Sequence, residues 1–78
     1  MADLKQTLAN IAKAIVDTPD DVMVTMEEED DSITLTLMVN PDDMGMVIGR
    51  HGKIAKAIRT LMKASVAGSG KKINVDIR

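Results

Sequence analysis

The chain has 78 residues, a net charge of -2, one histidine and no cysteine or aromatic residue. This length suits one small domain, which we expect to span residues 1–78, with a core packed from aliphatic side chains and seven methionines. The missing cysteines and the single histidine exclude disulfides, thiol catalysis and the usual zinc sites, so we expect no enzyme, no metal and no cofactor.

The first segment, residues 3–17, carries apolar side chains every three or four positions, from Leu4 to Val16. This spacing predicts an amphipathic helix. The helix should end before Pro19, because proline disfavours the helical conformation of the residue that precedes it.

Two strands are predicted next. Residues 22–27 are rich in β-branched side chains, and residues 32–39 alternate apolar and polar side chains. The acidic stretch 27–31 lies between them, and its contiguous carboxylates lack the alternating ligand spacing of a calcium loop. We therefore predict an antiparallel hairpin with a solvated turn.

The second half predicts two helices and a strand. Asn40 is a suitable helix cap, Pro41 suits the first helical position, and the acids that follow complement the helix dipole, so a short helix should run to Ile48. Gly49 ends it, and a longer helix follows from Lys53 to about residue 67. Residues 72–78 alternate again and predict a last strand.

The predicted order is α-β-β-α-α-β, an α+β fold. One-sided apolar stripes favour a three-stranded mixed sheet with the helices packed on one face. The last strand arrives after a helical crossover, so it should lie parallel to residues 32–39, with residues 22–27 as the antiparallel neighbour on the other side.

Charge is distributed unevenly along the chain. Residues 1–44 carry two lysines against eleven acids, a net charge of -9, whereas residues 45–78 carry eight bases against Asp76, a net charge of +7. A polyanionic partner should therefore bind the second half.

The most informative segment is the two-glycine turn Gly49-Arg50-His51-Gly52 between the two later helices. Glycine lacks a Cβ atom, so a nucleic-acid backbone can approach the peptide closely. We expect the free N–H groups at the start of the helix near Gly52 to face that backbone, with Arg50 and Lys53 adding positive charge.

The residues Val47-Ile48-Gly49-Arg50-His51-Gly52, within this element order, resemble the V-I-G-x-x-G signature of KH domains in the type II arrangement. The segment from Asn40 to Arg59 and the length of the chain resemble those of small bacterial single-KH proteins of the KhpA type, and the resemblance covers essentially the entire chain. It implies an RNA-binding protein that grips about four nucleotides of single-stranded RNA.

Several further expectations come with the resemblance. The loop would clamp the RNA backbone, and Ile48, Ile54 and Leu37 would form an apolar floor under the bases. Independently of the resemblance, Lys53 and Lys56 lie closer to the loop on the predicted helix and should contact phosphates, whereas Arg59 and Lys63 should form the solvated back of that helix. The predicted RNA-binding residues are Ile48, Gly49, Arg50, His51, Gly52, Lys53, Ile54 and Lys56.

The resemblance also implies a role and partners. It implies low sequence specificity, and an RNA chaperone or post-transcriptional regulator in the cytoplasm. The partners would be single-stranded RNA and either a second copy of the chain or a larger KH-containing protein. No apolar run approaches the roughly 18 residues of a membrane span, so no membrane role is expected.

Two alternatives remain open. A DNA-binding helix-turn-helix also joins two helices by a glycine turn, although here the helix before the turn is short and strands flank the pair. The second alternative is a protein-interaction module whose main function is dimerisation and in which RNA binding is secondary. A nucleotide-binding phosphate loop is excluded, because its pattern requires a glycine where Val47 stands.

Overall fold

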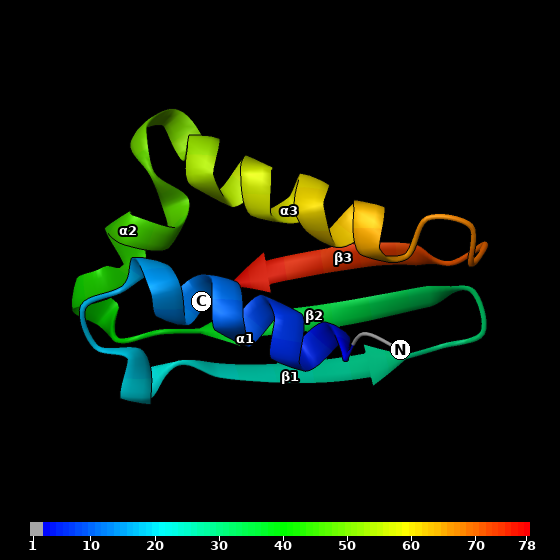
Figure 1. The fold of residues 1–78 in the computed structure, drawn as a ribbon, viewed down its shortest axis with the longest axis horizontal. Coiled ribbons are helices and arrows are strands. Elements are labelled where there is room, and N and C mark those ends of the chain that lie inside the picture. Colours follow the sequence, from blue (N-terminus) through cyan, green and yellow to red (C-terminus); the bar gives the residue numbers. More distant parts are fainter. Residues whose placement is uncertain (1–2) are drawn as a thin grey trace.

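The computed structural model describes residues 3–78, in which three helices cover one face of a three-stranded sheet (Figure 1). The helices and strands, in chain order, are α1 Leu4–Ile15, β1 Met23–Glu28, β2 Ser32–Met38, α2 Met44–Ile48, α3 Lys53–Ser65 and β3 Lys72–Ile77. Short 3-10 turns occupy Pro19–Asp21, Pro41–Asp43 and Arg50–Gly52. The predicted order of helices and strands is confirmed.

The sheet has the order β1-β2-β3, so both outer strands are edges. β1 and β2 are antiparallel, with Glu28 opposite Ile33, and the acidic segment between them forms the turn. β2 and β3 are parallel, with Ile33 opposite Ile73. The mixed topology follows the prediction, because the crossover through α2 and α3 returns the chain to the same end of the sheet.

The core lies between the helices and one face of the sheet. Ile33, Leu35 and Leu37 of β2 point to this side and are buried, whereas Thr34 and Thr36 alternate to the uncovered face. The expectation that Leu37 forms an exposed floor for RNA bases is wrong. Its side chain is 0% exposed, because the central strand is covered by the helices on that face.

α1 starts at a capping carboxylate. Asp3 accepts hydrogen bonds from the backbone N–H groups of Lys5 and Gln6, at 3.0 and 3.4 Å, which satisfies donors that have no partner within the helix. The helix ends at Ile15, two residues before the predicted end at residue 17, because Val16 turns into an extended conformation and packs into the core.

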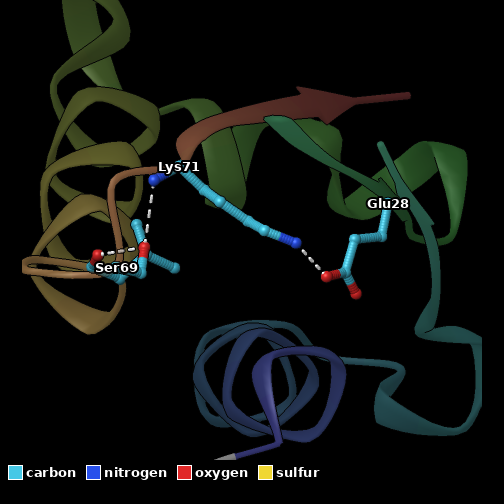
Figure 2. A network of polar contacts seen from close by, with 4 residues as sticks. Glu28, Ser69 and Lys71 are labelled. Atoms are coloured by element: carbon cyan, nitrogen blue, oxygen red, sulfur yellow. Dashed lines mark hydrogen bonds and ion pairs between the residues drawn. The ribbon is translucent and has the colours of Figure 1, made fainter. Parts of the chain in front are cut away.

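The connection from α3 to β3 is tied to the hairpin (Figure 2). The Lys71 ammonium pairs with the carboxylate of Glu28, and the hydroxyl of Ser69 accepts from the Lys71 N–H at 3.2 Å and donates to the carbonyl of Val66 at 2.7 Å. The ion pair is partly solvated, so it contributes no more than about 1 kcal/mol. The pair joins the residue before β3 to the end of β1, and the hydrogen bond from the Lys72 N–H to the Asp31 carbonyl, at 2.9 Å, marks the start of β3 beside β2.

Candidate nucleic-acid interface

Gly49 makes the turn between α2 and α3 possible. Its φ of 76° and ψ of 173° lie in a region of backbone space that is essentially restricted to glycine. A Cβ atom at this position would also come within 2.6 Å of Cγ1 of Ile54. Position 49 therefore requires glycine both for its backbone conformation and for the close approach of Ile54.

The next two bends are left-handed. His51 has φ 58° and ψ 24°, and Gly52 has φ 73° and ψ 15°. A Cβ atom on Gly52 would meet nothing within 4 Å, so this position needs glycine for its backbone angle and not for lack of space. These two successive left-handed residues form the turn in which Arg50 and His51 are exposed.

The unpaired amide donors of the loop are not those that the sequence predicts. The Gly49 and Gly52 N–H groups donate to the carbonyls of Gly45 and Gly49, at 2.9 and 3.1 Å, and the Lys53 N–H donates to Arg50. The prediction of free donors near Gly52 is therefore wrong. The Gly49 bond is the last helical bond of α2, and the 3-10 turn that starts at Arg50 pairs the Gly52 and Lys53 amides through its short-range bonds.

Two adjacent amides are left for a ligand. Within residues 3–78, the N–H groups of Arg50 and His51 have no protein acceptor, because no carbonyl precedes them at the right distance in the turn. Both residues are exposed. The loop therefore presents two neighbouring backbone donors, one of them on the cationic residue Arg50, and successive N–H groups of this kind can bind an anion.

The remaining predicted residues surround this turn. Lys53 and Lys56 are exposed on the first turns of α3. Ile48 and Ile54 are 38% and 37% exposed, an unusual exposure for isoleucine, so they place apolar surface next to the charged loop.

α3 has two different flanks on either side of its buried row, which consists of Ala55, Ile58 and Met62. One flank is basic and carries Lys56, Arg59 and Lys63, whereas the other carries Ile54 and Leu61. Nε of Arg59 donates to the carbonyl oxygen of Val75 at 3.2 Å, so the basic flank runs along the outer edge of β3. Ile54 therefore lies on the flank opposite the basic residues.

A hollow of about 290 Å³ lies where the basic flank meets this strand. Its lining residues are Arg59, Lys63, Ile73, Asn74, Val75 and Asp76. The sequence predicts that Arg59 and Lys63 form the solvated back of the helix, whereas in the structure both line this hollow at the edge of β3. A signal was present, because Arg59 follows the buried Ile58 directly and so lies at the border of the buried row.

The base of α2 is fixed by a buried acid. Asp43 is only 3% exposed, and its Oδ2 atom accepts a hydrogen bond from the backbone N–H of Thr18 at 2.9 Å. This bond joins the α1–β1 connection to the start of α2. Asn40 behaves as predicted, because its side chain caps the turn by accepting from the N–H of Asp42 at 2.9 Å.

Other features of the described chain lie elsewhere. A larger hollow, of about 510 Å³, is found between the start of α1 and the end of α3, away from the two-glycine loop. Residues 3–78 contain no cluster of three side chains suited to hold a metal ion. None of the helices described here has the length and apolarity to cross a bilayer.

Comparison with known proteins matches this chain over almost its whole length. A family model described as "KhpA/KhpB, KH domain" matches residues 5–77. A protein of Clostridium acetobutylicum named "RNA-binding protein KhpA" is 50% identical over 74 residues, which are 95% of this chain and 99% of that protein. Proteins of the same name from Listeria monocytogenes and Caldanaerobacter subterraneus are 47% identical (95% of this chain, 97% of that protein) and 48% identical (99% of each).

Proposed function

The chain belongs to the KhpA/KhpB family of KH domains, and from this premise we propose that it is a non-enzymatic protein that grips single-stranded RNA through residues 49–52. The described relatives are named for RNA binding. We propose that residues 1–78 act as a single KH domain, with low sequence specificity, as an RNA chaperone or post-transcriptional regulator.

The pair of unpaired amides carries this proposal. The N–H groups of Arg50 and His51 are adjacent, exposed and without a protein acceptor, so a phosphate oxygen bound there completes their hydrogen bonding. Gly49 and Gly52 contribute the backbone shape that exposes this peptide, and Arg50 contributes a full charge. A surface turn that binds no ligand needs neither two adjacent unpaired amides nor a positive charge next to them.

The chain of the RNA is expected to continue from the loop along the basic flank. Lys53 and Lys56 lie in the first turn of α3, directly after residues 49–52. They are three residues apart, so both side chains lie on the same side of the helix. Ile48 and Ile54 are proposed to contact the nucleotide at the loop itself, since Ile54 faces away from the basic flank.

Low specificity follows from the kind of contacts that the site offers. Phosphate contacts position the nucleic acid but carry no sequence information. The chain also has no aromatic residue, so the stacking platforms of other single-strand binders are absent. Most of the affinity should therefore be electrostatic.

The test is a titration of a fluorescently labelled single-stranded RNA over a range of salt concentrations. With phosphates neutralised by Arg50, Lys53 and Lys56, we expect log K to fall with log salt at a slope of about -2, since each phosphate contact on a single strand contributes about -0.7. Duplex DNA is the matched comparison. Tighter binding of duplex DNA than of single-stranded RNA would contradict the proposal and favour a helix-turn-helix function.

A second function, self-association, is favoured by the apolar flank of α3. Leu61 is 54% exposed, and Ile54 lies two turns before it on the same flank. A domain of this size gains stability from any partner that binds only its folded state. We propose that this flank pairs with a second copy or with a larger KH-containing protein.

Replacing Leu61 by Asp is expected to shift the protein to a monomer, because it places a charge within an apolar contact. Sedimentation velocity over a range of concentrations measures this shift. Met23→Asp is the matched control, since Met23 is also highly exposed, at 60%, but lies on β1. Equal dissociation by both variants, or by neither, would exclude this flank as the interface.

A further inference from the structure

The outer edge of β1 carries backbone groups that face away from the sheet. The Arg78 N–H donates to the Leu37 carbonyl, so the backbone groups of Leu37 point to β3. The residue opposite Leu37 in β1 is Val24. In an antiparallel ladder, opposite residues point either towards each other or both outward, so the N–H and carbonyl of Val24 turn away from β2, and those of Met26 follow. β1 therefore offers a row of donors and acceptors to an added strand.

The two edges of the sheet are not equally open. At β3, Nε of Arg59 holds the Val75 carbonyl, so a strand added there would lose a bond of its ladder. Along β1, within residues 3–78, no further strand lies beyond the edge, and Met26 in its middle is 38% exposed. The edge that can accept a partner strand is therefore that of β1.

α1 forms the second wall of a groove along this edge. β1 is one margin of the sheet, and α1 lies next to it on the covered face (Figure 1). A hollow of about 250 Å³ lies between Val24 and α1, and the hollow of about 510 Å³ described above continues past Met26 to Glu28. Asp3 lines both hollows. Extended peptides bind exposed sheet edges as an added strand, and pockets beside the edge select their side chains.

The charges along this edge favour a basic partner. No lysine or arginine lies between Lys13 and Arg50 in the sequence, whereas acids lie on both sides of β1. Inside the groove, the carboxylate of Glu28 is already paired with Lys71. Glu27 alternates to the uncovered face of the sheet and is exposed there. An added strand therefore meets hollows on the covered side and a negative charge on the uncovered side.

We propose that the outer edge of β1 binds an extended segment of another protein, in which basic and apolar residues alternate, as a fourth strand of the sheet. Its apolar side chains enter the hollows beside Val24 and Met26, and its basic side chains lie next to Glu27. A second copy of the chain does not supply this segment, because residues 23–28 contain two glutamates and no basic residue, and Arg59 covers part of the β3 edge.

The experiment is an NMR titration of the isotope-labelled protein with the peptide KVKLKVK, blocked at both ends. We expect the amide resonances of Val24 and Met26 to shift and those of residues 49–52 to stay in place. The peptide EVELEVE, with reversed charge, and KKKKVLV, with the same composition but no alternation, should not bind. Binding of either control as tight as that of KVKLKVK would overturn the inference.

Methylation of the peptide nitrogens tests the strand pairing itself. In an added strand, every second N–H faces β1 and the others face solvent. One version of KVKLKVK is N-methylated on its lysines and another on its apolar residues. We expect one version to lose about 10-fold or more in affinity and the other to bind as the parent peptide does. Equal affinities of the two versions would show that no ladder forms and would contradict the proposal.

Glu27→Lys is expected to weaken binding of KVKLKVK about 10-fold, because it places like charges opposite each other across the edge. Asp17→Lys is the matched control, since it makes the same charge change at an exposed position beyond the end of α1, and it should cost less than about two-fold. Equal losses in both variants, or no binding by the parent, would overturn the inference. So would a protein dimer that the peptide displaces in sedimentation velocity, because the edge would then belong to a second copy.

Discussion

Replacing Arg50 and His51 together by Asp is expected to lower the affinity for single-stranded RNA by about 100-fold or more. The two carboxylates would stand next to the unpaired amides, where the phosphate is proposed to bind. The backbone amides remain in this variant, but the two carboxylates repel the phosphate from them, and the loss of two hydrogen bonds to a charged group costs about 3 kcal/mol, which is about 100-fold in affinity. Fluorescence anisotropy measures the loss, and circular dichroism should show unchanged helix and strand content.

Lys5→Asp with Gln6→Asp is the matched control. It alters the net charge by the same amount, but at exposed positions in the first turn of α1, where acids favour the helix dipole. This control should weaken RNA binding only slightly, through long-range charge. If both double variants lost affinity equally, net charge and not the loop would be responsible, and the clamp would have to be abandoned.

Gly49→Ala is expected to remove most of the stability of the domain. The backbone at this position is accessible essentially only to glycine, which costs another residue about 1–3 kcal/mol. The new methyl group would also clash with Ile54, and overpacking of this kind costs about 1–3 kcal/mol more. A single core in a chain of this size rarely supplies more than about 3–5 kcal/mol. Thermal and urea unfolding followed by circular dichroism measure the loss.

Gly45→Ala serves as the control for Gly49→Ala. Gly45 is exposed within α2, and a Cβ atom there would meet nothing within 4 Å. Alanine favours the helix over glycine by about 0.5–1 kcal/mol, so this variant should be slightly more stable than the parent. An unfolding midpoint for Gly49→Ala equal to that of the parent would show that the turn at this glycine can rearrange.

The fold was largely predictable because apolar side chains recur at a regular spacing within each helix and strand. The alternation in β2 and the helical spacing in α1 and α3 indicated which side chains face the core, and the α2–α3 crossover then determined that β3 runs parallel to β2. The element ends were less predictable. The end of α1 at Ile15 depends on how Val16 packs in the core, which periodicity does not reveal.

The position of the two-glycine loop was predictable from the sequence, but its hydrogen bonds were not. The glycine pair located the loop, yet which amides remain free depends on the 3-10 turn that begins at Arg50, and turn type is set by backbone angles. Leu37 alternates in step with Ile33 and Leu35, which face the core, so the strand pattern itself indicated its burial and was inconsistent with a floor for RNA bases. The contact of Arg59 with Val75 could not be predicted, because it depends on where α3 lies relative to β3. The helical period of a sequence shows which side of a helix a residue occupies, but not which element lies next to that side.

The parallel pairing of β2 with β3 sets the order in which the binding surface can be assembled. Ser32 and Lys72 are partners in this ladder, so the contact joins parts of the chain that are far apart in sequence, and such contacts form late in folding. A nascent chain on the ribosome that has been elongated only through α3 has its loop sequence but no Val75 edge. The two-glycine turn is therefore synthesised before the strand that completes the sheet, and the core closes only when Ile73 and Val75 of β3 have joined it.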